Sequence, residues 1–209
     1  MGELFGVYRE IPEGEKILVK DDMFAEFAFK EKKLLRKKEL PILEDIPGEV
    51  IDLYALPCLT NKHLHLLLLV IVKKLGPFTK WWSIPLEYID NATIKTEKKG
   101  GKKVAAINIS LALPKKGLLF KKTKIDFTFY TPNIVGWQSY LAKVVEFNAI
   151  LKKYQKDLKN LKSKIEGLDK DLAKGKISTE AYQQLLSKYK EEMSELEEKI
   201  KELKERGVE

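Results

Sequence analysis

An apolar repeat with alternating steps of three and four residues constrains the fold of this chain more than any other feature. The repeat runs from Trp137 to Leu172 and resumes from Tyr182 to Leu203. This spacing places the apolar side chains on one stripe of an α-helix. The other positions between Lys152 and Asp171 are nearly all charged or polar. The stripe is therefore the narrow kind that pairs with one helical partner.

Capping residues define the ends of two predicted helices. Thr131 is a plausible N-cap, and Pro132 suits the first helical position because its missing N–H would be unpaired there. A helix from 132 to 173 would be about 60 Å long at about 1.5 Å per residue. We expect it to stop at Gly175, and Ser178 then to cap a second helix. A turn at 174–178 would fold the second helix back along the first.

The stripes on both sides of this turn form the predicted helix-pairing seam. Its members are Leu151, Tyr154, Leu158, Leu161, Ile165, Leu168, Leu172, Tyr182, Leu186, Tyr189, Met193, Leu196, Ile200 and Leu203. Burial in a bare helix pair is incomplete, so dimerisation into a larger bundle is an alternative. The sequence leaves open whether the seams pair within one chain or between the two chains of a homodimer.

The preceding part of the chain has the pattern of short β-strands. Val50–Leu59 is rich in apolar residues, and Leu64–Val72 is almost continuously aliphatic, as in a strand buried on both faces. Val104–Leu113 and Ile125–Phe129 keep their apolar residues on alternate positions. The near-regular spacing predicts a small barrel or sandwich. We therefore expect an α+β protein, with a β domain over 1–148, whose closing helix begins near 132, and a helical hairpin over 149–209.

Composition bounds the class of protein. Hydrophobic residues make up 44% of the chain, which is enough for a packed core. A single cysteine, Cys58, excludes an intrachain disulfide and a thiolate metal site within one chain, and fits a reducing compartment. Met1–Tyr8 lacks the pattern of a signal peptide, and Leu66–Val72 is too short for a membrane helix, which needs about 20 residues. We expect a cytoplasmic protein, at most peripheral to a membrane.

Positive charge is concentrated in the first part of the chain. The net charge is +8; residues 1–150 carry 24 Lys and Arg against 18 Asp and Glu, whereas residues 151–209 carry 15 against 13. Such an excess favours anionic partners, either lipid headgroups or nucleic acid. The many Lys and Glu residues also suit a thermophile, a composition in which any single lysine cluster is less significant.

Two short motifs give the first part a resemblance to a known family. Leu59–Leu64, with the sequence LTNKHL, resembles the L-T-N-K-R-L strand start of bacterial and archaeal PH-like (GRAM-type) domains, with His63 in place of the usual Arg. Ile84–Ile89, with the sequence IPLEYI, resembles their I-P-L-x-x-I segment, and Trp137 matches the tryptophan of their closing helix. The segment around Gly175–Tyr182 resembles the core of the SHOCT motif.

The resemblance implies a seven-strand, partly open barrel capped by a helix, and a binding role. Within it, a basic stretch would lie near the first strands, where PH domains collect anionic headgroups. The alternative is a solvated loop in a Lys-rich protein. The residues of the stretch are Lys30, Lys32, Lys33, Arg36, Lys37 and Lys38.

A second candidate site mixes lysines with aromatic residues around Gly76-Pro77. Such a mixture suits a lipid interface or stacking on nucleobases. The alternative is an inert loop with one tryptophan in the core. Because neighbouring strand residues face opposite ways, we expect at least one of the two tryptophans to be exposed. The site consists of Lys73, Lys74, Phe78, Lys80, Trp81 and Trp82.

Histidines and the cysteine are the remaining candidates for chemistry. His63 and His65 lie two apart on one strand face, a geometry that can serve a metal, but spacing supplies no third ligand. Packing or surface roles are therefore favoured for both, and a buried structural thiol is favoured for Cys58. The chain lacks a phosphate loop, a dinucleotide fingerprint, a nucleophile elbow and an H-E-x-x-H motif. We predict no catalytic site, no metal and no cofactor.

The leading functional hypothesis is a non-enzymatic scaffold or adaptor. The β domain would bind a membrane surface or a protein, and the hairpin would drive self-association or dock a partner. Nucleic-acid binding through the basic first part is the alternative, to which Lys98–Lys103 would contribute, although that stretch also fits a hairpin tip. The chain has no RNP pattern or recognition helix to support it.

Overall fold

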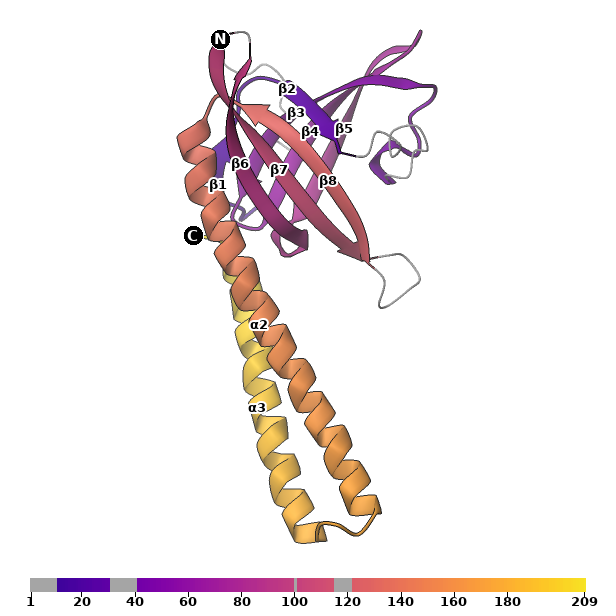
Figure 1. The fold of residues 1–209 in the computed structure, drawn as a ribbon, viewed down its shortest axis with the longest axis vertical. Coiled ribbons are helices and arrows are strands. Elements are labelled where there is room, and N and C mark those ends of the chain that lie inside the picture. Colours follow the sequence, from indigo (N-terminus) through magenta and orange to yellow (C-terminus); the bar gives the residue numbers. More distant parts are fainter. Residues whose placement is uncertain (1–10, 31–40, 100, 115–121) are drawn as a thin grey trace. The chain divides into compact units, whose positions relative to one another are not determined.

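The computed structural model describes residues 11–30, 41–99, 101–114 and 122–209 (Figure 1). The chain is α+β and divides into two compact units, one that reaches Val145 and includes 208–209, and one that spans Glu146–Gly207. The strands are β1 (Ile17–Lys20), β2 (Ala25–Phe29), β3 (Val50–Thr60), β4 (His63–Val72), β5 (Gly76–Pro85), β6 (Ile89–Lys99), β7 (Lys102–Pro114) and β8 (Lys122–Thr131). The helices are α2 (Ile134–Ala173) and α3 (Thr179–Arg206), with short 3-10 turns η2 (Pro41–Leu43) and η3 (Leu86–Tyr88).

The eight strands form one open antiparallel sheet. Its order is β5-β4-β3-β2-β8-β7-β6, and β1 pairs with β3. Strand β2 joins the two halves of the sheet, because Ala25 pairs with Ala55 of β3 whereas Phe27 pairs with Phe129 of β8. The predicted β-rich first part is confirmed, but the sheet is open and has eight strands, whereas the resemblance implied a seven-strand barrel.

The two edge strands are joined by the short turn η3. Among the described strands, β5 and β6 end the order and share no ladder. Pro85, at the end of β5, has no N–H to donate. The next N–H, of Leu86, donates to the carbonyl of Lys62 at 3.0 Å. The turn η3 is thus fixed to the β3–β4 turn by a backbone hydrogen bond.

The core of the first unit lies between the two halves of the sheet. Aromatic rings from three strands meet there: the Phe27 and Phe127 centroids are 5.1 Å apart, and those of Trp82 and Phe127 are 5.8 Å apart. Leu66 and Leu68 of β4 face the same core and are fully buried. This convergence of large apolar side chains, each contributing roughly 1.5–3 kcal/mol when fully buried, stabilises the unit.

From Leu66 onwards, strand β4 is fully buried on one face only, which corrects the prediction made from its continuous aliphatic run; His65 on the other face is also buried. Its even-numbered residues from Leu64 to Val72 are buried, whereas Leu67, Leu69 and Ile71 are half-exposed. The prediction was wrong because β4 pairs with both neighbours through antiparallel ladders. Antiparallel sheets commonly leave one face open to solvent.

Helix α2 begins two residues later than the sequence pattern predicts. Pro132 precedes the helix, and the cap is Asn133, whose Oδ1 accepts the N–H of Gly136 at 3.2 Å. The Thr131 hydroxyl instead accepts the N–H of Asn133 at 3.0 Å. Trp137 in the first turn is fully buried, with its ring centroid 5.0 Å from that of Phe129.

The second unit is an antiparallel helical hairpin formed within one chain (Figure 1). Gly175 makes the turn with a φ of +64°, and Ser178 caps α3 by accepting the N–H of Ala181 at 3.2 Å. The two helices are joined near the turn, where the Tyr182 hydroxyl donates to Asp169 Oδ1 at 2.8 Å. The predicted seam residues from Leu151 to Leu203 are all buried or half-buried, whereas most of the positions between them are exposed.

Candidate functional site

A carboxylate and two imidazoles meet at the β3–β4 hairpin of the first unit. The Nδ1 atom of His63 lies 2.6 Å from Oε1 of Glu15, and the Nε2 atom of His65 lies 3.1 Å from Oε2 of the same carboxylate. The histidines open β4 and project to one face because strand side chains alternate. We name Glu15, His63 and His65 the Glu–His–His cluster.

Backbone pairing brings Glu15 to the histidines. Strand β1 pairs with β3, so that Ile17 lies opposite Thr60. The N–H of Lys16 donates to the Asn61 side-chain oxygen at 2.9 Å, which fixes the residue next to Glu15 on the hairpin turn. The carboxylate is therefore held by strand pairing and a turn contact.

Two hydroxyl groups orient the members of the cluster. The Thr60 hydroxyl donates to Oε2 of Glu15 at 2.5 Å and accepts the N–H of His63 at 2.9 Å. The other ring nitrogen of His65, Nδ1, lies 2.9 Å from the Ser83 hydroxyl on the neighbouring strand. The His65 ring also stacks on Trp81 at a centroid distance of 5.4 Å. These contacts leave the three side chains little rotational freedom.

Burial of the cluster is uneven. The side chain of His65 is 0% exposed and that of Glu15 is 5% exposed, whereas that of His63 is 27% exposed. Burial lowers the pKa of His65 despite its contact with Glu15. Burial alone would raise the pKa of Glu15, but hydrogen bonds from Thr60 and His65 and the nearby His63 outweigh it and lower that pKa. The carboxylate thus stays ionised although its side chain is almost wholly buried.

The cluster has the composition and spacing of a metal-binding group. One ligand atom from each residue lies within 4.8 Å of the others, and the described part of the chain holds no second group of this kind. Sequence spacing indicated the two histidines but not Glu15, which lies 48 residues before His63. No local pattern marks Glu15, since it follows Pro12 and Gly14 in a turn region. Only strand pairing brings it to the histidines.

Cys58 adjoins the cluster but is not a member of it. It is the ladder partner of His65 and is fully buried, which confirms the expected buried thiol. Burial is the main cause that raises its pKa to about 12; Glu15 adds to the shift and Lys20 opposes it. The thiol is therefore protonated at neutral pH and has little nucleophilic or ligand character.

The predicted basic stretch lies almost wholly outside the described residues. Lys30, which directly follows β2, is exposed, and its N–H donates to the carbonyl of Asp126 at 2.9 Å. The other members are outside the part of the chain that the structure describes: Lys32, Lys33, Arg36, Lys37 and Lys38.

The structure does not bring the second candidate site together as one surface. Lys73 and Lys74 are exposed at the β4–β5 turn. Along β5, Phe78, Lys80 and Trp82 alternate with Trp81, so the aromatic residues divide between the two faces of the sheet. Trp82 contacts the core ring of Phe127, as described above, whereas Trp81 stacks on His65. Both tryptophans are half-buried, so neither forms an exposed aromatic tip.

The tip of the β6–β7 hairpin carries four lysines in two facing pairs. Lys98 lies opposite Lys103, and Lys99 lies opposite Lys102. Lys99 bonds to Glu26 at 2.5 Å. The other three are exposed and form no ion pair with another described residue. This tip matches the stretch that the sequence indicated as a basic hairpin end.

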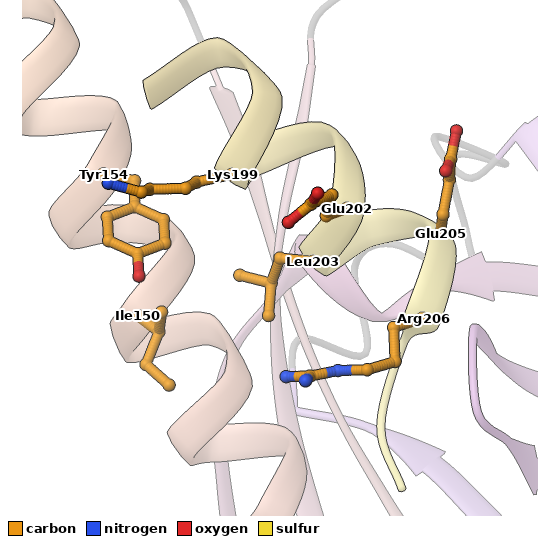
Figure 2. Close-up of a pocket in the computed structure, with 7 residues that line it drawn as sticks. All are labelled: Ile150, Tyr154, Lys199, Glu202, Leu203, Glu205 and Arg206. Atoms are coloured by element: carbon orange, nitrogen blue, oxygen red, sulfur yellow. The ribbon is translucent and has the colours of Figure 1, made fainter. Parts of the chain in front are cut away.

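A shallow hollow of about 470 Å³ lies beside the seam of the second unit (Figure 2). Figure 2 shows Tyr154 and Ile150 on α2 facing Leu203 on α3, with charged side chains around them. The hollow is lined by two acidic residues, Glu202 and Glu205, and by two basic residues, Lys199 and Arg206. Neither histidine of the chain lines it. The hollow is an open groove beside the helix pair, and no set of groups converges there.

Comparison with protein-family models, with curated proteins and with solved structures found no match for this chain. Among the described residues, no helix combines the length and the apolar composition that crossing a lipid bilayer would require.

Proposed function

We propose that the protein is a non-enzymatic adaptor whose first unit docks on an anionic membrane surface through the tip of the β6–β7 hairpin. The proposal rests on the lysines that face each other across the hairpin tip: Lys98 lies opposite Lys103, and Lys99 lies opposite Lys102. Like charges directly opposite each other on neighbouring strands are destabilising. Lys99 is paired with Glu26, whereas Lys98 and Lys103 form no ion pair with a described residue. The repulsion between Lys98 and Lys103 therefore supports a ligand that neutralises them.

The local structure concentrates this charge at the end of a ribbon. Gly101 adopts a φ of +78°, which lets the chain reverse tightly between Lys99 and Lys102. Lys98 and Lys103 share one face of the ribbon and Lys99 and Lys102 the other, because side chains alternate along a strand. The four side chains therefore share an end of the hairpin but not a face.

This distribution favours a membrane over nucleic acid. A planar anionic surface that meets the hairpin end can contact lysines on both faces. A ribbon in the major groove of DNA presents only one face to the base edges. Each Lys near an anionic membrane contributes about 1 kcal/mol. The resemblance of Leu59–Leu64 to PH-like domains also supports a binding role for this unit.

The helical hairpin supplies the adaptor arm in this proposal. Its apolar stripe is occupied by the partner helix of the same chain, and most outward positions of both helices are exposed and polar. A partner protein would therefore meet a charged helical surface, on which Lys predominates over 152–164 of α2 and Glu over 191–198 of α3. Such contacts favour fast, salt-sensitive association.

Vesicle flotation at low salt tests the proposal. Full-length protein should float with vesicles of phosphatidylserine and phosphatidylcholine but not with phosphatidylcholine alone. The variant Lys98→Gln with Lys103→Gln removes about 2 kcal/mol of attraction, so its partition coefficient should fall about thirty-fold. Lys159→Gln with Lys162→Gln changes the charge equally on exposed sites of α2 and should leave partition nearly unchanged.

Two results would contradict the proposal. One is an absence of binding to anionic vesicles at low salt, and the other is an equal loss of partition in the two double variants. A gel shift with nucleic acid that falls steeply with salt, without vesicle binding, would replace the membrane by nucleic acid as the ligand.

A further inference from the structure

We propose that Glu15, His63 and His65 form a binding site for one Zn²⁺ ion. This site is independent of membrane docking, because it lies at the β3–β4 turn rather than at the β6–β7 tip. Two imidazole nitrogens and one carboxylate oxygen are a ligand set that zinc accepts in proteins, with one further position left for water.

The donor atoms are close to the separations that an ion requires. Zinc bonds of about 2.0–2.2 Å keep ligand atoms no more than about 4 Å apart. Two of the contacts within the cluster, 2.6 Å and 3.1 Å, are hydrogen-bond distances, so these atoms move apart by up to about 1 Å when an ion takes the place of the shared protons. All three atoms lie within 4.8 Å of one another, so a shift of side chains by about 1 Å completes the site.

The surrounding contacts resemble the outer shell of a zinc site. The Nδ1 atom of His65 is engaged by Ser83, which leaves Nε2 directed at the carboxylate. The hydroxyl of Thr60 holds one oxygen of Glu15. Hydrogen bonds of this kind fix ring and carboxylate orientation, so a ligand group does not lose much freedom when the metal binds.

Access to the site follows from its uneven burial. His65 and Glu15 are almost wholly buried, whereas 27% of the His63 side chain is exposed. An ion therefore enters beside His63, and the open coordination position faces solvent on that side. The opposite side is closed by the stack of His65 on Trp81.

A purely structural role is the competing explanation. In that case the cluster would be a hydrogen-bonded tie that fixes the segment before β1 to the hairpin, and metal would not bind. Both explanations predict that changing Glu15 or His65 weakens the fold. A measurement of metal binding distinguishes the two explanations. Its result is simple to assign because the chain has only two histidines.

The experiment uses full-length protein without a histidine tag. Titration with ZnCl₂ in a calorimeter should show one ion per chain with a dissociation constant in the micromolar range or tighter. Titration with CoCl₂ should give visible absorption bands of low-coordinate Co²⁺. The imidazole resonances of both histidines should shift in an NMR spectrum on addition of Zn²⁺. They belong to His63 and His65, because the chain has no other histidine.

Variants locate the site. His63→Gln changes the most exposed member and should weaken Zn²⁺ binding at least a hundredfold. Ser83→Ala changes an exposed residue that only orients His65, and should weaken binding roughly ten- to a hundredfold. Glu49→Gln, which alters an exposed carboxylate at the other end of β3 and β4, should leave binding unchanged.

The proposal is overturned if folded wild-type protein takes up no Zn²⁺ and gives no Co²⁺ bands. It is also overturned if His63→Gln and Ser83→Ala, both shown to be folded by circular dichroism, bind as tightly as wild type. A failure of vesicle flotation has no bearing on these results, since neither titration contains lipid.

Discussion

Asp21 and Trp137 are joined by a buried hydrogen bond across 116 residues of chain. The indole Nε1 of Trp137 donates to Oδ1 of Asp21 at 3.1 Å, and the Thr131 hydroxyl donates to the same oxygen at 2.9 Å. Asp21 is 6% exposed and Trp137 is 0% exposed. The contact connects the β1–β2 turn to the first turn of α2, and so fixes the start of that helix on the sheet.

Replacing Trp137 by Phe should destabilise the first unit more than the same change at Trp81. The first variant removes a hydrogen bond to a buried carboxyl group, which should cost about 1.5–3 kcal/mol in the free energy of unfolding beyond the loss of ring area. Trp81 Nε1 is buried without a hydrogen-bond partner among the described residues, so Trp81→Phe removes no such bond. Urea denaturation measures both, and equal losses would contradict the assigned role of the Asp21–Trp137 bond.

Asp21 should also make stability depend on pH. Burial is the main cause that raises its pKa above the ordinary value; the charge of Asp22 adds to this, and the hydrogen bonds from Trp137 and Thr131 oppose it. The pKa of Asp21 is higher in the folded than in the unfolded state. Its contribution to the free energy of unfolding is therefore fully present below about pH 4 and is lost as pH rises through the folded-state pKa. Asp21→Asn cannot ionise. Between pH 3.5 and about pH 7, the free energy of unfolding of Asp21→Asn should therefore increase relative to that of wild type, as measured by urea titrations.

A difference between Asp21→Asn and wild type that stays constant over this pH range would show that Asp21 does not titrate differently in the folded and unfolded states. Using the difference between the two proteins cancels the contributions of other carboxyl groups.

Cys58 should be nearly inert in the folded protein. Its pKa of about 12 leaves few thiolates at pH 8, about a thousandfold fewer than for an ordinary thiol. Reaction with a chromogenic disulfide reagent at pH 8 should be slower than in guanidinium chloride by at least that factor. Equal rates would mean that the first unit opens readily or that the thiol is not buried.

The helices could be predicted closely because their determinants are local. The alternating steps of three and four residues and the Gly175–Ser178 turn are visible within a short window of sequence, and the helix end at Ala173 agrees with the prediction. The start was misplaced by two residues because both Thr131 and Asn133 have side chains that can cap a helix. Only the observed hydrogen bond to the Asn133 side chain decides between them.

The sheet and the candidate site depend on long-range pairing, which a single sequence does not reveal. The two faces of β5 follow from alternation, but the register with β4 decides that Trp82 faces the aromatic core and that Trp81 lies against His65 on the other face. Glu15 joins two histidines of β4 only because β1 pairs with β3. The turn after Pro85 likewise contacts Lys62, a residue that lies more than 20 positions earlier in the chain.

Two glycines in the second unit should respond oppositely to alanine. Gly175 has a φ of +64°, a conformation that an L-residue adopts at a cost, so Gly175→Ala should destabilise the hairpin by about 1 kcal/mol. Gly167 lies inside α2, and a Cβ there would meet nothing within 4 Å. Gly167→Ala should therefore stabilise the helix by roughly 0.5–1 kcal/mol. Thermal unfolding followed by the helical circular dichroism signal should show a lower midpoint for the first variant and a higher one for the second. If Gly175→Ala had no effect, the left-handed conformation assigned to residue 175 would be contradicted.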